Sequence, residues 1–478
     1  MPGTGEGWSA NVTQLVRALA VGAAALLLVG CDAIDGVLGT CRAPSDTETF
    51  AFEVEWTRVV QANQTATNLA PILAGQPTGV EVLLTMVDGE LRPRILDVSA
   101  TVDVSVDDER VGSLELELGC VRGERSAMRG TIPAAWIRSG VQVQVSVRSA
   151  TPNVSVPGET FVVDPIVAEV PVFDVTIVPL IVGGTHPDTS RAVYEGWIEQ
   201  ARRRFAIDRY DLEIHPPLDL GLGGECAVPL KFTALQELWF YWSTLESERF
   251  FVGVLPCSVG GVAFMPGFVQ VTSQGPGSVR TFLHELGHNF GLAHAPCGDP
   301  LGIDPGYPYS GGVLGLPGFD AGEDAWIAAT SADLMGYCQG WWLSDYHYAR
   351  SARYRMVQER PPVLATLADE PWPASVLVQG QLRPDGTVIV THAVRRFEPT
   401  QRRPTNADEP RDTVRIEVVD RDGAVLVGHD ATLVEVDHVD TRLFSARIGV
   451  TDAAALAARA VRASYAEEHA TRALVDGD

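Results

Sequence analysis

The eleven residues from His284 to His294 constrain this chain more than any other segment, because they bring three imidazoles close together. In a helix of 3.6 residues per turn, His284 and His288 lie on one face and can bind the same metal ion. Gly291 can adopt a positive φ without steric cost, which lets the chain end the helix and return His294 as a third ligand. Three protein ligands leave one position open for water, as in catalytic zinc sites.

The alternative is an ordinary helix whose histidines are solvated or satisfied in the core. The chain has only 10 His in 478 residues, yet three of them fall in these eleven positions. The segment reads H-E-x-x-H-x-x-G-x-x-H and resembles the zinc motif of the metzincin metalloproteases. The resemblance implies a Zn²⁺ ion on His284, His288 and His294. It also implies that Glu285 is the general base and acid that acts on a zinc-activated water.

A second segment, Ser331 to Cys338, resembles the methionine-bearing turn that lies under the metzincin zinc site. The resemblance implies that Met335 forms a soft, apolar floor beneath the imidazoles. Tyr337 matches a tyrosine that some members place near the metal, where it stabilises the tetrahedral intermediate. In the alternative interpretation, Met335 is an ordinary core residue and Tyr337 is a packing aromatic.

The resemblance covers roughly residues 170–360. It implies an α/β metzincin-like catalytic domain at 166–360, a mixed twisted sheet with long helices, in which Gly261 to Phe264 is either an edge strand or an internal one. The core of the motif is similar to adamalysin-like and bacterial mucin-protease-like members. Ala295, which follows the third histidine, matches none of the Glu, Pro, Asp or Ser found there in astacins, serralysins, adamalysins and matrixins.

The flanking regions alternate apolar and polar residues with a period of two, the pattern of half-buried strands. Val141 to Val147 is one example in the first region. We therefore predict a multidomain chain with a β-sandwich-like domain at 31–165 and a β-rich accessory domain at 361–478. The last segment, Asp452 to Leu474, is rich in alanine and is predicted to be a helical tail.

The N-terminus predicts export. Ala18 to Val29 is an apolar run of the length of a signal-peptide core, too short to span a bilayer. It ends in Leu28-Val29-Gly30-Cys31, which resembles a bacterial lipobox. We expect residues 1–30 to be a lipoprotein signal peptide and Cys31 to carry the lipid. The protein would then be attached to the bacterial cell envelope, at the periplasmic face or the cell surface. A plain N-terminal anchor and an unlipidated Cys31 are the alternatives.

Six cysteines remain after Cys31, an even number that suits an oxidising exterior. If each cysteine pairs within its own predicted domain, the suggested disulfides are Cys41–Cys120, Cys226–Cys257 and Cys297–Cys338. The alternative for the first is a cysteine switch, in which an N-terminal thiolate caps the zinc.

The charge balance limits the partners. With 36 basic and 61 acidic residues the net charge is −25, which argues against nucleic acid. The motifs predict a zinc-dependent endopeptidase that cleaves extracellular or envelope proteins or glycoproteins. The alternatives are a surface adhesin or glycan-binding lipoprotein that uses the protease fold as a scaffold, and an envelope protein with a purely structural zinc. The sequence sets no oligomeric state.

Overall fold

A computed structural model describes residues 41–476, apart from short gaps at 65–69, 90–92, 157, 159, 224–225, 246, 248, 358–373, 397–411, 437–439 and 467. These residues are mostly β-sheet with few helices, and they form two compact units. The first unit comprises the chain up to Val59, Gly79–Ile132 and Val141–Asp164. The second comprises Val60–Thr78, Pro133–Gly140 and Pro165–Asp478.

Two predictions about the N-terminus fall on residues 1–40, outside the described part of the chain. They are the signal peptide and the lipid on Cys31. Among the described residues, no helix combines the length and apolar character needed to cross a membrane.

The first unit contains two four-stranded sheets, in the orders β10-β1-β3-β8 and β11-β9-β5-β6. Their alternating sequences place every second side chain inside. In β5, for example, Val98, Ala100, Val102, Val104 and Val106 are buried, and the residues that alternate with them are partly exposed. The strands are β1 (Phe50–Val60), β3 (Thr78–Asp88), β5 (Val98–Val106), β6 (Glu109–Glu117), β8 (Arg125–Ile132), β9 (Val141–Ser149), β10 (Val154–Ser155) and β11 (Thr160–Val163).

The second unit is built on a mixed sheet whose first five strands have the order β14-β13-β15-β17-β16. The first four run parallel, and β16 is antiparallel to β17. The central strand β15 is buried at all six positions, as expected for a strand covered on both faces. These strands are β13 (Phe173–Pro179), β14 (Tyr210–Ile214), β15 (Phe250–Leu255), β16 (Val262–Met265) and β17 (Val269–Ser273).

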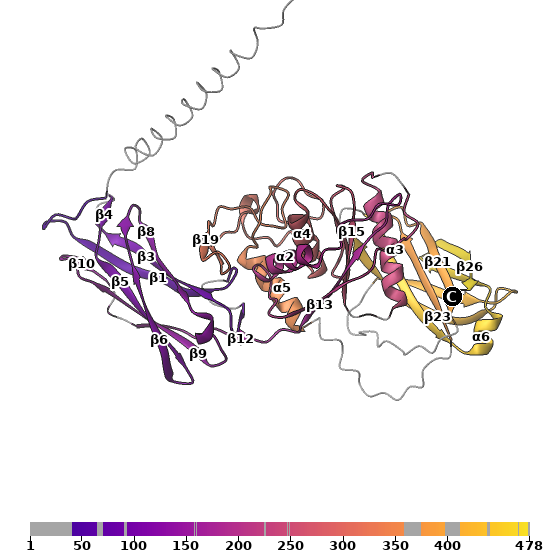
Figure 1. Cartoon of the computed structure of the whole chain (residues 1–478), viewed down its shortest axis with the longest axis horizontal. Helices are drawn as coiled ribbons and strands as arrows, with labels where there is room; N and C mark the ends of the chain where they lie inside the picture. Colours follow the sequence, from indigo (N-terminus) through magenta and orange to yellow (C-terminus); the bar gives the residue numbers. More distant parts are fainter. Residues whose placement is uncertain are drawn as a thin grey trace, which may run out of the picture. The chain divides into compact units, whose positions relative to one another are not determined.

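Helices cover both faces of this sheet. Phe250 and Val252 pack in one apolar cluster with α2 (Arg191–Arg202) and α4 (Ser278–Asn289), which lie side by side (Figure 1). Phe251 and Leu255 point to the other face and pack against α3 (Leu230–Thr244). A further helix, α5 (Asp345–Val357), closes this region. The strand alternation therefore decides which helix each side chain meets.

The helices of this region are 12 to 15 residues long. The long helices implied by the resemblance are therefore not supported in the described residues. In α4 the reason is local, since Gly277 before the helix and Gly291 just after it have φ of 82° and 79°. A left-handed residue at each end stops the helix from extending.

A segment from the N-terminal half packs into the second unit. Trp342 Nε1 donates to the carbonyl of Ala62 at 2.9 Å, and the buried Asn63 amide donates to Leu343 O at 3.1 Å. The short strand β2 (Ile72–Leu73) pairs with β12 (Val167–Ala168). Ala62 and Asn63 therefore help to hold the segment that follows the candidate site.

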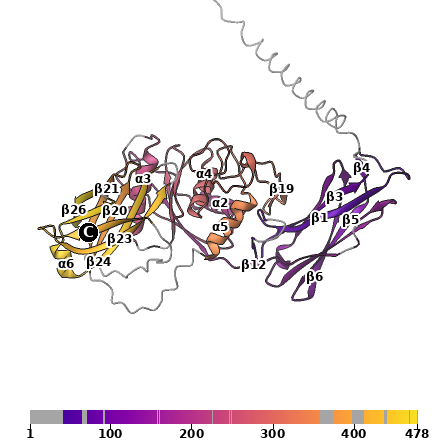
Figure 2. The ribbon, with the colours of Figure 1, turned by 180° about the vertical axis from the view of Figure 1, so that it is seen from behind.

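The C-terminal strands continue the same sheet. Beyond β16 the order is β23-β24-β20-β21-β27, and Figure 2 shows β20, β21, β23 and β24 next to one another. Phe264 and Met265 of β16 pair with Val436 and Glu435 of β23, so β16 is internal along that half of its length. The strands are β20 (Ala374–Leu382), β21 (Val388–Arg396), β22 (Thr413–Val419), β23 (Val425–Val436), β24 (Arg442–Val450), β25 (Ala460–Tyr465), β26 (Glu468–Ala473) and β27 (Val475–Asp476).

The prediction of a helical tail was wrong for most of its length. Only α6 (Asp452–Ala457) is helical, and the rest forms the hairpin of β25 and β26. Val461 and Ala463 are fully buried in β25, in the apolar cluster of the C-terminal strands. This alternating burial outweighs the helix propensity of alanine.

Candidate metal centre

Helix α4 carries His284, Glu285 and His288, and all three side chains are buried. The helix ends at Asn289, and Gly291 turns the chain with a φ of 79°. The N–H of Gly291 donates to the carbonyl of His288 at 2.8 Å, which closes the helix end. His294 follows and is also buried, so the three histidines of the motif meet at one place.

The three histidines converge through their Nε2 atoms. The Nε2 atom of His284 lies 3.1 Å from that of His288 and 3.2 Å from that of His294. Each Nδ1 atom faces a backbone carbonyl: Leu334 O at 3.0 Å, Leu292 O at 2.7 Å and Leu301 O at 2.5 Å respectively. A carbonyl can only accept, so each Nδ1 carries the proton and each Nε2 presents a lone pair.

Lone pairs that converge in this way, with His284 Nε2 3.1 and 3.2 Å from its two neighbours, repel unless a cation lies between them. Tetrahedral zinc with Zn–N bonds of about 2.1 Å places its nitrogens about 3.4 Å apart, close to the observed spacing. All three ligand atoms lie within 4.8 Å of one another. The donor set therefore fits a zinc ion, and within the described residues it is the one such group of ligating side chains.

Met335 packs against helix α4 at Gly287. Its side chain is fully buried, and a Cβ atom added at Gly287 would overlap its sulfur. Gly287 stands between the two histidines of α4, so a larger residue there would push Met335 away. The carbonyl of Leu334, next to Met335, is the acceptor for His284 Nδ1. The turn thus fixes one ligand directly.

The carboxylate of Glu285 lies against the backbone of Gly261. A Cβ atom at Gly261 would come within 2.6 Å of both Cγ and Oε1 of Glu285. The carbonyl of Gly261 accepts from the buried Lys231 Nζ at 2.6 Å. Only glycine leaves room for the carboxylate at this point.

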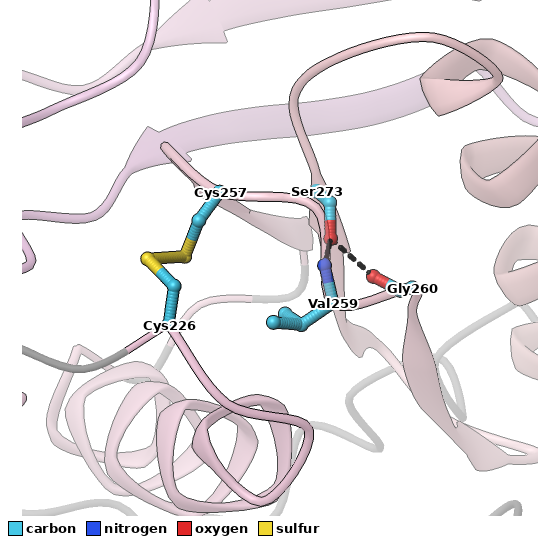
Figure 3. Close-up of a disulfide and its surroundings, with 5 residues drawn as sticks. All are labelled: Cys226, Cys257, Val259, Gly260 and Ser273. Carbon is cyan, nitrogen blue, oxygen red and sulfur yellow. Dashed lines mark hydrogen bonds between the residues drawn. A yellow bond between two sulfur atoms is a disulfide. The ribbon is translucent and has the colours of Figure 1, made fainter.

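Two kinds of contact hold the loop before Gly261, the hydrogen bonds of Ser273 and a disulfide (Figure 3). Ser273 Oγ accepts from Val259 N at 2.9 Å and donates to Gly260 O at 2.6 Å. The disulfide Cys226–Cys257 ties the start of the same loop to the segment before α3. These contacts fix the wall beside Glu285.

Tyr337 lies beside two of the three histidines. Its ring centre lies 5.1 Å from that of His294 and 6.0 Å from that of His284, and the residue is 37% exposed. Its N–H donates to Cys297 O at 2.7 Å, and the neighbouring Cys338 is bonded to Cys297. The phenol is therefore near the ligands and reachable from solvent.

A buried carboxylate, that of Asp333, organises the turn, although no sequence pattern points to it. Asp333 Oδ1 accepts from Met335 N at 2.7 Å and from His347 Nδ1 at 3.0 Å, and Oδ2 accepts from Ser344 N at 2.7 Å. Burial raises the pKa of Asp333, but the His347 charge and these hydrogen bonds outweigh it and hold the pKa below its usual range. The hydroxyl of Tyr307 lies 3.1 Å from Oδ2. No fixed spacing links these residues in the sequence, so no motif could have found them.

The three disulfides join the cysteine pairs that pairing within the predicted domains suggested. Cys41 is bonded to Cys120 within the first unit, so its sulfur is not a free thiol for a cysteine switch.

Residues 259–341 match the model of the peptidase M66 family. Together with the histidine triad, the match supports a metalloprotease family. Gly261, Glu285, Met335 and Tyr337 all lie inside the matched segment, which covers the site from the loop before β16 to just beyond Tyr337. A search of the curated proteins finds no match to the chain.

Solved structures resemble the chain only weakly. A chaperone–substrate complex is 12% identical and has a TM-score of 0.21 over 42% of this chain and 41% of that one. A calcium-binding mutant of Bacteroides uniformis β-glucuronidase 2 is 8% identical, with a TM-score of 0.16 over 50% and 27%. A family 2 glycosyl hydrolase from Bacteroides cellulosilyticus is 11% identical, with a TM-score of 0.18 over 89% and 64%. The chain spans less than two thirds of each, and scores this low carry no argument about fold or function.

Proposed function

We propose that the protein is a zinc-dependent endopeptidase of the metzincin type, with His284, His288 and His294 as the metal ligands. The observation that carries the proposal is the convergence of three Nε2 lone pairs beside a buried glutamate. Three protein ligands leave an open position, which distinguishes a catalytic zinc site from a structural one. The turn at Met335, packed against Gly287, supports the metzincin assignment.

Glu285 is the general base in this proposal. When bound, zinc supplies a Lewis acid that polarises the scissile carbonyl and lowers the pKa of water to about 7. Glu285 takes a proton from the attacking water and passes it to the leaving amine. Gly261 keeps the carboxylate in place, because a side chain there would occupy the same space. Tyr337 donates a hydrogen bond to the oxygen of the scissile carbonyl, which becomes negatively charged in the tetrahedral intermediate.

The substrate and the location belong to the same proposal. We infer that the substrates are extracellular or envelope proteins, including glycoproteins, and that the protein is exported and anchored through a lipid on Cys31. The support is the apolar run before Cys31, the six paired cysteines and the acidic composition.

The decisive test compares the wild type with Glu285→Gln, both loaded with zinc. We expect equal zinc content and thermal stability, and a loss of peptide hydrolysis of at least about a hundredfold in the variant, since the proton acceptor is gone. Mapping of new protein termini after incubation with an envelope extract measures activity and side-chain preference together. Full hydrolysis by zinc-loaded Glu285→Gln would reject the mechanism. A wild type that holds zinc but cleaves nothing would favour a scaffold or structural role.

A chelator provides the matching control. Removal of the metal should abolish hydrolysis, and added zinc should restore it. A structural zinc would instead show itself first as a lower melting temperature.

A further inference from the structure

The reacting groups of the site come from two separate segments that must be held in register. Glu285 and two ligands lie on α4, whereas Tyr337 lies on the turn after Met335. The contacts of His284 and Gly287 fix the turn up to Met335, on the N-terminal side of Tyr337. On its C-terminal side Cys338 is bonded to Cys297, which is not part of α4, so a contact to α4 itself is needed to fix the phenol relative to Glu285.

Arg280 makes that contact. It lies one turn before His284, on the face of α4 that also carries His288. Its Nη2 donates to Gly336 O at 2.8 Å and its Nε donates to Gly340 O at 2.9 Å. The two carbonyls bracket the segment from Tyr337 to Gln339. A planar guanidinium holds two acceptors in a fixed geometry, which a lysine ammonium does not.

The surroundings of Arg280 disfavour its charged form, so the two hydrogen bonds to Gly336 and Gly340 are made by a cation that has lost part of its hydration. Removal from water lowers the pKa of Arg280, and the negative charge of Glu285 opposes this shift. A cation that is half-buried with two carbonyl partners is kept in one position by them. The Arg280 cation is therefore close enough to interact with the carboxylate of Glu285, the proposed general base.

We propose that Arg280 is a positioning residue that fixes the Tyr337 segment to the motif helix, an inference that rests on the proposed peptidase function. Among the described residues, the hydrogen bonds of its guanidinium go to the carbonyls of Gly336 and Gly340 and not to a histidine of the triad, so Arg280 acts through Tyr337. Loss of the two Arg280 hydrogen bonds leaves the three histidines in place but allows the Tyr337 phenol to move.

Arg204 offers a matched control. It is more deeply buried than Arg280, and its Nε donates to the carbonyl of Trp341, one residue beyond Gly340. It comes from the segment after α2, and its hydrogen bonds do not bracket Tyr337. Arg204→Lys therefore tests the general effect of weakening an arginine–carbonyl contact in this region.

The test is a double-mutant cycle on zinc-loaded full-length protein, with Arg280→Ala, Tyr337→Phe and the double variant. We expect each single variant to lower kcat by roughly tenfold or more with little change in KM and unchanged zinc content. On the Tyr337→Phe background, Arg280→Ala should lower kcat by less than about twofold, because the phenol it positions is already gone. Multiplicative losses, or loss of zinc from Arg280→Ala, would overturn the proposal.

A second readout does not depend on activity. Amide hydrogen exchange over residues 336–341 should be faster in Arg280→Ala and in Arg280→Lys than in the wild type, and unchanged over 284–288. Arg280→Lys keeps the charge and serves if the alanine variant does not fold. Unchanged exchange over 336–341 in both variants would contradict the positioning role. A wild type without peptidase activity would reject the proposed function, and the exchange result would still decide the role of Arg280.

Discussion

At the scale of single residues, Asp333 links the turn at Met335 to the helix α5. Its two oxygens accept from backbone N–H groups of Met335 and Ser344 and from the His347 ring. Both Asp333 and His347 are fully buried. Removing one partner of such a network leaves the other donors unpaired in a place that water cannot reach. The carboxylate therefore keeps Leu334 O in position for His284.

Asp333→Asn should destabilise the protein in a pH-dependent way. At pH 7 we expect the free energy of unfolding to fall by about 3 kcal/mol, because one amide cannot accept from all these donors. The pKa of Asp333 is lowered in the folded protein, so its contribution is complete above the unfolded pKa of about 4 and is lost as the pH falls through the folded value. The gap between variant and wild type should therefore shrink in urea unfolding below about pH 4.

The control for this prediction is Asp211→Asn, a change at a side chain that is 64% exposed. It should alter stability by less than about 1 kcal/mol at any pH. A gap between Asp333→Asn and wild type that stays constant from pH 7 to pH 3 would contradict the assigned pKa direction.

At the scale of elements, the sequence predicts those strands, helices and turns that depend on interactions between residues close together in the chain. The periodicity of β5 and β9, the helix that carries His284, and the turn at Gly291 followed from residues within one element. The contacts between Lys231 and Gly261, or between Asp333 and His347, join residues that lie 30 and 14 positions apart with no repeated spacing. The tail at β25 shows the same limit, since burial against distant strands decided its structure.

At this scale, the disulfide Cys297–Cys338 is expected to affect activity, because it holds the segment that carries Tyr337. It closes a sequence separation of 41 residues and borders Tyr337. Chain entropy predicts a loss of about 4 kcal/mol at most when such a link is removed. We expect Cys297→Ser with Cys338→Ser to lower the free energy of unfolding by about 2–4 kcal/mol and to lower kcat at temperatures where the protein stays folded.

The matched comparison is Cys41→Ser with Cys120→Ser, which removes a disulfide of the first unit. Thermal unfolding and steady-state kinetics on both variants separate stability from activity. Equal kcat losses in the two variants would show that Cys297–Cys338 has no specific effect on the site.

At the scale of the whole molecule, the C-terminal strands belong to the sheet that carries the candidate site. Gly261, immediately before β16, lies beside Glu285, and Phe264 and Met265 at the far end of the strand pair with β23. Helix α3 also contacts the C-terminal strands, since Glu237 Oε2 lies 3.3 Å from His392 Nε2 and the Phe240 ring stacks on that of His392 at 4.2 Å. Val436 and Leu443 share an apolar cluster with Phe264 and α3. The pairing leaves no local signal in the sequence, because its partners lie about 170 residues apart.

We therefore expect Val436→Asp to damage the site from a distance. A carboxylate in this apolar cluster costs more than about 3 kcal/mol and weakens the pairing of β23 with β16. The variant should lose solubility or melt at a lower temperature, and its folded fraction should hydrolyse peptides more slowly. Glu435→Ala, at the exposed neighbouring position, is the control and should behave as wild type. A chain ending at residue 360 should aggregate for the same reason, because it exposes Phe264 and the edge of β16. A soluble, fully active fragment of that length would show that the C-terminal strands are dispensable for the peptidase.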